Sequence, residues 1–189
     1  MIAPMELPKR TDLTADEFIA WALDQPEGRF ELSGGEIIAM SPERLGHARA
    51  KKRVVNALDA AISGKGLECE GIVDGVAVRV DDRTVYEPDA FVHCGPPLPD
   101  DVVEVVDPVI VVEVISPSTS HIDSGAKLVA YFQMPSVHHY LMVDLHRRAV
   151  VHHRRADLGA VDSRICREGT IVLDPPGIVV EVSDLLPAE

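Results

Sequence analysis

The sequence predicts a mixed α/β fold, of the α/β or α+β class, in which helices flank a central mixed β-sheet. Most of the chain after residue 67 consists of short apolar strands separated by turn residues, and three stretches with helical spacing lie before and within that run. The chain has 189 residues, and 46% of them are hydrophobic. That size suits one sizeable core, so we expect a single domain over residues 1–189.

The amino-terminal third predicts a helix, a hairpin and a second helix. Thr14 followed by Glu17 fits a capping box at the start of a short amphipathic helix. Residues Arg29–Met40 favour a β-hairpin, because a Gly-Gly pair supplies the positive φ angles of a tight turn. The longest helix is predicted over Arg44–Ser63, with an apolar stripe of Leu45, Ala48, Val55, Leu58 and Ile62.

The remaining elements are mainly strands. A helix is expected over Ile122–Phe132, and Gly95–Asp101 is a proline-rich loop. The strands are predicted at Leu67–Val73, Val76–Val80, Thr84–His93, Pro108–Ile115, Val137–Asp144, Ala149–Arg154, Ile165–Leu173 and Ile178–Val182.

The net charge of −13 at first sight opposes binding to nucleic acid. The basic residues are concentrated, however. The windows Arg44–Arg53 and His146–Arg155 together hold 9 of the 18 Lys and Arg residues and no acidic residue. Solvated faces and phosphate contacts are alternative interpretations of these windows.

Three cysteines, at 69, 94 and 166, lie far apart and form no CxxC. This spacing argues against a zinc site, and the odd number argues against a disulfide framework, so we expect small buried hydrophobic residues. The adjacent pairs His138-His139 and His152-His153 cannot each chelate one metal, because neighbouring side chains in a strand point to opposite faces. No apolar run approaches the roughly 20 residues of a membrane span. Since the first residues also lack signal-peptide features, we expect a soluble, cytoplasmic protein without a membrane partner.

One carboxylate lies in the middle of an apolar strand. Glu113 is the exception within Val109–Ile115, and burial would raise its pKa unless a cation offsets it. Asp89 follows Pro88, which favours a strand end or a bulge and would aim Asp89 out of the regular pleat. If the two strands pair, the carboxylates approach each other. We therefore expect a magnesium ion between Asp89 and Glu113, with a bound water as the nucleophile.

The next predicted helix supplies a positive charge. Asp123, Lys127 and Tyr131 lie at i, i+4 and i+8 along one face. Lys127 is the only Lys or Arg between Arg83 and Arg147. It is a candidate to act beside phosphate or an attacking water, and a surface pair with Asp123 is the alternative.

These segments resemble, in order and over nearly the whole chain, the Uma-two family of restriction endonucleases. Arg29–Glu36 is similar to its "YELIDGE" opening, and His47 lies where the family has a histidine. Val111–Thr119 closely matches "VVEVLSPST". Further matches are Tyr86–Val92 to the "PDV" strand, Asp123, Lys127 and Tyr131 to the D-x3-K-x3-Y helix, and Tyr140–Asp144 to "YWLVD".

The resemblance implies a restriction-endonuclease-like fold of the PD-(D/E)XK superfamily, with an extra amino-terminal hairpin. It implies Mg²⁺, or Mn²⁺, held by Asp89, Glu113 and the backbone carbonyl of Val114. The superfamily's usual strand lysine is Ile115 here, so the resemblance implies that Lys127 replaces it from the helix. Glu31 adds a further carboxylate. The DNA contacts are expected from His47, Arg49, Lys51 and Lys52.

The first hypothesis for function is therefore a magnesium-dependent DNA endonuclease. The net charge and the missing strand lysine favour an alternative, an inactive nucleic-acid-binding or assembly module of the same fold. A third hypothesis is hydrolysis of another phosphodiester, such as a nucleotide or RNA. The resemblance also implies a homodimer, because a duplex has two strands to cut.

Overall fold

The computed structural model describes residues 12–25, 27–115 and 121–188, and the side chains of residues 121–124 lie outside the described part. The helices are α1 (Ala15–Leu23), α2 (Leu45–Lys65), α3 (His121–Gln133), the 3₁₀ helix η1 (Asp157–Gly159) and α4 (Val182–Leu185). The strands are β1 (Phe30–Ser33), β2 (Glu36–Ala39), β3 (Cys69–Val73), β4 (Ala77–Asp81), β5 (Thr84–Tyr86), β6 (Ala90–Cys94), β7 (Glu104–Val105), β8 (Ile110–Ile115), β9 (His139–Asp144), β10 (Ala149–Arg155), β11 (Val161–Cys166), β12 (Thr170–Leu173) and β13 (Ile178–Glu181).

Two sheets and one separate hairpin form the β part of the fold. The larger sheet has six strands in the order β11-β10-β9-β8-β6-β3, and β8 and β9 are its parallel neighbours. The five-stranded sheet has the order β2-β1-β5-β4-β7, and β12 and β13 form a two-stranded sheet. The expected mixed sheet flanked by helices is confirmed, although the strands divide between two sheets.

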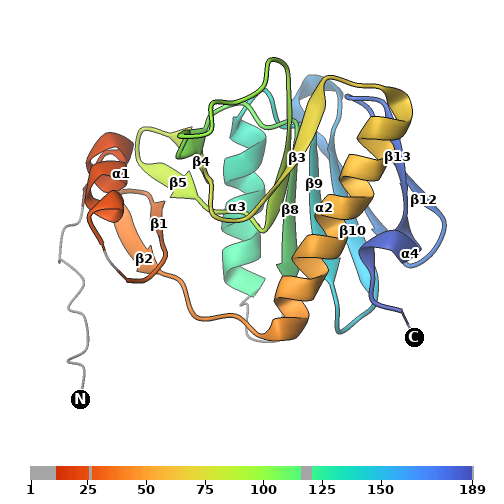
Figure 1. Cartoon of the computed structure of the whole chain (residues 1–189), viewed down its shortest axis with the longest axis horizontal. Coiled ribbons are helices and arrows are strands. Elements are labelled where there is room, and N and C mark those ends of the chain that lie inside the picture. Colours follow the sequence, from red (N-terminus) through yellow and green to blue (C-terminus); the bar gives the residue numbers. More distant parts are fainter. Residues whose placement is uncertain (1–11, 26, 116–120, 189) are drawn as a thin grey trace.

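Strand β8 lies between two apolar layers, as its pattern predicts. Ile110, Val112 and Val114 pack with α2, α4 and the β12–β13 hairpin. Val111, on the other face, packs with Tyr131 of α3 and with residues of the five-stranded sheet. Helices α2 and α3 thus lie on opposite faces of the six-stranded sheet (Figure 1). A third cluster joins α1 to the β1–β2 hairpin.

Local signals at the amino terminus are confirmed. Thr14 and Glu17 form the predicted capping box of α1, with each side chain accepting a hydrogen bond from the other residue's backbone amide. Gly34 and Gly35 have φ angles of 58° and 89° at the β1–β2 turn. A residue with a Cβ would be strained there, so these glycines fix the hairpin register.

Two predicted strands are each two strands in different sheets. The stretch Thr84–His93 divides into β5 and β6 because Glu87, Pro88 and Asp89 interrupt it. The stretch Ile165–Leu173 divides into β11 and β12 at Gly169, whose φ is 77°. Apolar alternation alone does not reveal such a change of sheet, because both halves have the same period.

The predicted stripe of α2 is only partly right. Leu45 and Ala48 are exposed and Val55 is half-buried, whereas Leu58 and Ile62 are buried. The buried face of the helix comprises Ala50, Lys51, Val54, Leu58 and Ile62. The stripe was misplaced because a lysine takes one of its inward positions, for reasons that lie in the site below.

The interpretation of the cysteines as small hydrophobic residues is wrong for two of them. Cys69 and Cys94 are joined by a disulfide. They lie directly opposite each other in the antiparallel pair of β3 and β6. Sequence spacing did not show this, because the two strands meet across 25 residues of chain. Cys166 is free and half-buried.

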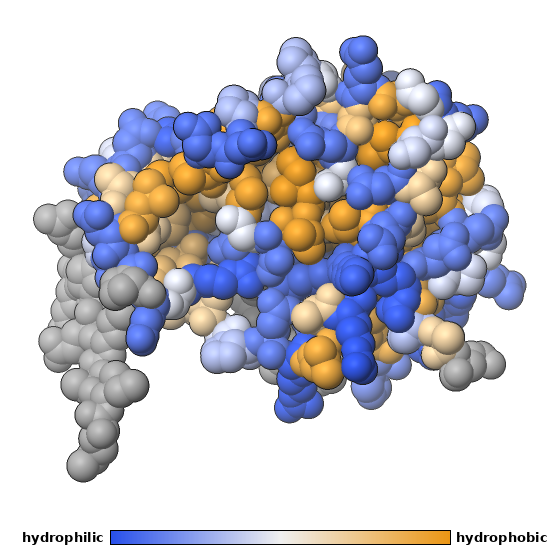
Figure 2. Space-filling view, in the orientation of Figure 1, coloured by the Kyte–Doolittle hydropathy of each residue, from blue (hydrophilic) through white to orange (hydrophobic). Residues whose placement is uncertain are grey.

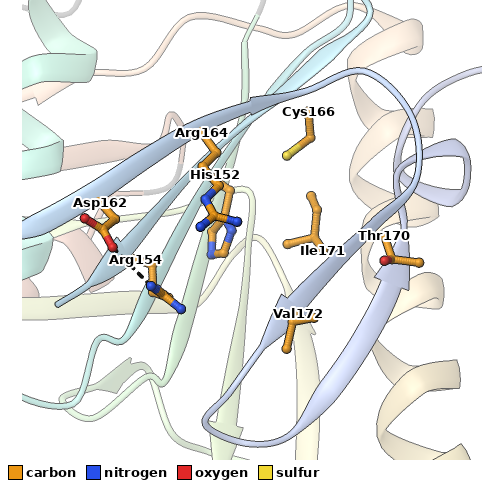
Figure 3. A pocket seen from close by; sticks show the side chains of 8 residues that line it. All are labelled: His152, Arg154, Asp162, Arg164, Cys166, Thr170, Ile171 and Val172. Atoms are coloured by element: carbon orange, nitrogen blue, oxygen red, sulfur yellow. Dashed lines mark hydrogen bonds and ion pairs between the residues drawn. The ribbon is translucent and has the colours of Figure 1, made fainter.

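The histidine pairs contact each other across strands rather than along them. His139 Nδ1 lies 2.9 Å from His152 Nε2, and both side chains are buried. His152 also lines a cleft of about 120 Å³ between the β10–β11 strands and the β12–β13 hairpin, with Arg154, Arg164 and Cys166 among its other walls (Figure 3). Among the described helices, none combines the length and the apolar character that crossing a bilayer requires.

This histidine pair predicts a pH-dependent stability. Burial lowers the pKa of both His139 and His152 to about 4, with further lowering by neighbouring positive charge. In the unfolded chain both protonate near pH 6.5. Acid therefore adds protons first to the unfolded state, and this stability is present above pH 6.5 and lost as the pH falls towards 4. Between pH 7 and 5 we expect a loss of up to about 2 kcal/mol per histidine.

The measurement is urea unfolding of the wild type and of His152→Gln at pH 7, 6 and 5. The variant should lose less free energy of unfolding over this range than the wild type. Parallel pH dependences in the two proteins would contradict the assignment.

Candidate active site

Asp89 and Glu113 lie beside each other at one end of the six-stranded sheet. In the β6–β8 pair, Ala90 is opposite Val112, so continuing the antiparallel register by one residue places Asp89 opposite Glu113. Asp89 Oδ2 accepts a hydrogen bond from the Val114 amide at 2.6 Å. The Pro88 interruption therefore lets the Asp89 side chain turn along the strand edge instead of following the pleat.

The Asp89 carboxylate is bound by two basic side chains from α2. Lys51 Nζ lies 2.8 Å from Oδ1, and His47 Nε2 lies 3.0 Å from Oδ2. Burial of Asp89 favours the neutral acid, but the hydrogen bond from His47 and the charge of Lys51 outweigh it. The pKa of Asp89 is therefore lowered, and the group is an anion at neutral pH.

The pKa of Glu113, on the other face of the sheet, is shifted in the opposite direction to that of Asp89. Its Oε1 accepts hydrogen bonds from Lys127 Nζ and from the Tyr131 hydroxyl, both at 3.1 Å. Burial raises the pKa of Glu113 to about 7. Lys127 opposes this shift, while the negative charges of Asp89 and Glu31 add to it. An additional cation near Glu113 would thus favour its ionised form.

Glu31 reaches the same lysine from the five-stranded sheet. Its Oε1 accepts from Lys127 Nζ at 2.8 Å and from the Glu87 amide at 3.0 Å. Lys127 and Glu31 are only 6% and 5% exposed. One ammonium therefore bridges carboxylates from both sheets, and the site depends on how these sheets dock.

The donor set fits a divalent cation such as Mg²⁺ or Mn²⁺. Asp89 and Glu113 offer carboxylate oxygens, which hard cations prefer. Within a strand the N–H and C=O of one residue point to the same side. The Val114 carbonyl therefore points to the side on which its amide meets Asp89.

Additional ligands would come from outside this pair of carboxylates. Among residues 12–25, 27–115 and 121–188, no three His, Cys, Asp or Glu side chains are grouped so that they could hold a metal ion by themselves. This is compatible with Mg²⁺, which commonly keeps several waters and binds one or two carboxylates together with substrate phosphate.

The four residues expected at DNA separate into two groups. His47 and Lys51 point inward to Asp89, whereas Arg49 and Lys52 are exposed on α2. Hydrophilic side chains gather over the amino-terminal end of this helix at the lower part of the molecule (Figure 2). Tyr131 joins the site through Glu113. The side chain of Asp123 and the motif residues 116–119 lie outside the described residues.

Sequence reasoning missed a second group of charged residues beside the site. Arg29 binds Asp74 at 2.8 Å, Glu87 at 2.5 Å and Glu43 at 3.3 Å. Asp74 precedes Gly75 and has the pattern of an ordinary turn residue, and Glu43 has that of a residue preceding a helix. The only local signal was Arg29, a cation at the start of a hairpin that is otherwise apolar and acidic.

The fold is a mixed α/β architecture that brings Asp89, Glu113 and Lys127 to one end of the six-stranded sheet. Residues 15–187 match the Uma2 family, described as "Putative restriction endonuclease". The chain therefore belongs to the Uma2 family.

A sequence relative and a solved structure extend this comparison. The protein "Uncharacterized protein slr1290" of Synechocystis sp. is 29% identical over 132 residues, which are 69% of this chain and 68% of that protein. A crystal structure described as a putative nuclease belonging to DUF820, from Anabaena variabilis, matches with a TM-score of 0.73 and 15% identity. The match covers 92% of this chain and 97% of that chain, and at this identity it shows the fold.

Loss of the bridging ammonium should destabilise the protein. Lys127→Met leaves Glu31 and Glu113 buried without their shared cation, so we expect a loss of roughly 3 kcal/mol in the free energy of unfolding. The double variant Lys127→Met/Glu31→Gln should recover part of it, because one uncompensated carboxylate is removed. Urea unfolding at pH 7.5 measures both changes.

The matched control is Lys52→Met, because the Lys52 side chain on α2 is exposed. This change should alter the free energy of unfolding by no more than about 0.5 kcal/mol. Equal stability of Lys127→Met and Lys52→Met would contradict the bridging role.

Proposed function

We propose that this protein is a metal-dependent endonuclease that hydrolyses phosphodiester bonds of DNA with Mg²⁺ or Mn²⁺. The observation that carries the proposal is that the Asp89 carboxylate accepts from the amide of Val114, the neighbour of Glu113, while the Lys127 ammonium lies beside Glu113. The family membership supports a nuclease. Glu31 of the five-stranded sheet and Glu113 of the six-stranded sheet bind the same lysine, which supports the proposal that residues 1–189 act as one restriction-endonuclease-like domain.

In this proposal Asp89, Glu113 and the Val114 carbonyl hold the cation. When bound, the cation lowers the pKa of a coordinated water and neutralises negative charge that develops on the phosphate. Lys127 lies beside Glu113, and it orients water or phosphate on that side. Its ammonium carries the charge that Ile115, at the usual strand position, lacks. Glu31 fixes the position of Lys127 at 2.8 Å.

The exposed residues Arg49 and Lys52 would contact the phosphate backbone. They lie on the same helix as His47 and Lys51, which reach Asp89. A phosphate held at this end of α2 would therefore lie near the carboxylates. These contacts would be electrostatic and would carry no sequence information.

Cleavage of supercoiled plasmid is the direct test. The wild type should nick DNA in the presence of Mg²⁺ or Mn²⁺ and not in a chelator. Each of Asp89→Asn, Glu113→Gln and Lys127→Met should reduce the rate by about 100-fold or more, since each removes several kcal/mol of charge stabilisation. Lys65→Gln, at the far end of α2, is the control and should keep the wild-type rate.

The same assay separates the alternatives. Binding of DNA without any metal-dependent cleavage would favour the inactive nucleic-acid-binding module. One observation favours that alternative: Lys51 and His47 already bind the two carboxylate oxygens of Asp89. Faster cleavage of RNA or of a small phosphodiester than of duplex DNA would assign the third hypothesis.

Binding to DNA should also depend on salt through the exposed cations. Arg49→Gln and Lys52→Gln should each weaken binding and reduce the slope of log K against log salt by about 1. Fluorescence anisotropy with a duplex in Ca²⁺ or in chelator, at several salt concentrations, measures the slope. An unchanged slope in the double variant would exclude these two residues as phosphate contacts.

A further inference from the structure

A second buried lysine lies on the side of Asp89 that faces α2. Lys51 is 4% exposed. Its Nζ lies 2.7 Å from Glu43 Oε1, 2.7 Å from Asp74 Oδ2 and 2.8 Å from Asp89 Oδ1. The three carboxylates come from three separate segments. Glu43 lies two residues before α2, Asp74 lies in the β3–β4 turn and Asp89 directly precedes β6.

This arrangement uses the full donor capacity of an ammonium. Lysine has three N–H donors, and three carboxylate oxygens lie within hydrogen-bond distance. Lys51 therefore has no donor left for a phosphate. Its described partners favour a role in holding Asp89 instead of the DNA contact expected from the sequence.

The acidic partners of Lys51 are themselves fixed. Arg29 binds Asp74 at 2.8 Å and Glu43 at 3.3 Å, so these carboxylates cannot move away from Lys51 without losing a second ion pair. Three carboxylates around one point repel one another unless a cation lies between them. The effect is strongest at Asp89, which is buried, whereas Asp74 is half-buried and Glu43 is exposed. In this protein that cation is the side-chain ammonium of Lys51, a residue of α2.

We propose that Lys51 is a positioning residue that occupies the second cation position of the site and so limits the site to one divalent ion. The ammonium lies between Asp89 and the pair Glu43 and Asp74. The divalent ion is held on the other side of Asp89, towards Glu113. This inference rests on the proposed metal centre, and it concerns how many ions that centre takes.

The prediction is a change in metal stoichiometry when Lys51 is removed. Lys51→Ala leaves three carboxylates around an opened space, which fits the oxygen coordination of Mg²⁺ or Mn²⁺. The full-length wild type should bind one Mn²⁺ per chain, and Lys51→Ala should bind two. Lys51→Ala/Asp74→Asn should bind the second ion about tenfold or more weakly, because one charged ligand is lost.

Electron paramagnetic resonance of free Mn²⁺ counts the bound ions, with Lys52→Ala as the matched control. If Lys51→Ala and the wild type each bind one ion, the inference is overturned while the proposed metal centre stands. The same holds if the wild type itself binds two ions. No binding by the wild type overturns the proposed metal centre, and this inference falls with it.

Folding of the variant is itself informative. Circular dichroism in chelator and in Mn²⁺ shows whether Lys51→Ala needs the ion to fold. A variant that is unfolded in chelator and folds with Mn²⁺ supports the inference, since the ion replaces the ammonium. A variant that stays unfolded at saturating Mn²⁺ overturns it.

Discussion

The pairing of buried carboxylates with two lysines is the interaction on which the rest of this structure depends. Glu31, Asp89 and Glu113 are withdrawn from water, and each would be costly there without a cation. Lys127 serves two of them and Lys51 serves the third. Removing either lysine would leave negative charge without a neutralising cation. The packing of the sheets and the candidate site therefore depend on the same few side chains.

The interruption at Pro88 determines how those groups meet. Strands β5 and β6 follow each other in sequence but belong to different sheets. The residues between them therefore lie where the sheets join, and Asp89 can contact α2 while Glu113 contacts α3. Had the chain continued as one strand, Asp89 would have alternated onto the face of α3 with Glu113, away from His47 and Lys51.

Much of this arrangement could be predicted from local sequence, and the reasons are physical. A capping box, a Gly-Gly turn and a Pro-Asp pair each act over a few residues, so their consequences are visible in the sequence. Lys127 was identifiable because helical spacing places it with Tyr131 on one face. The ion pairs of Lys51 could not be predicted, since its partners Glu43 and Asp74 meet it only after the β3–β4 turn packs against α2. The Cys69–Cys94 pair depends on strand register in the same way.

The contact between Glu31 and Lys127 joins residues that are 96 positions apart in the chain. Contacts of such long range are costly in loop entropy and form slowly. The hairpin that carries Glu31 is made early in synthesis, but its carboxylate has no partner until α3 has been made and docked. During synthesis the site is therefore among the last regions to be completed, and until then the nascent chain carries these acidic residues without the lysine that neutralises them in the folded protein.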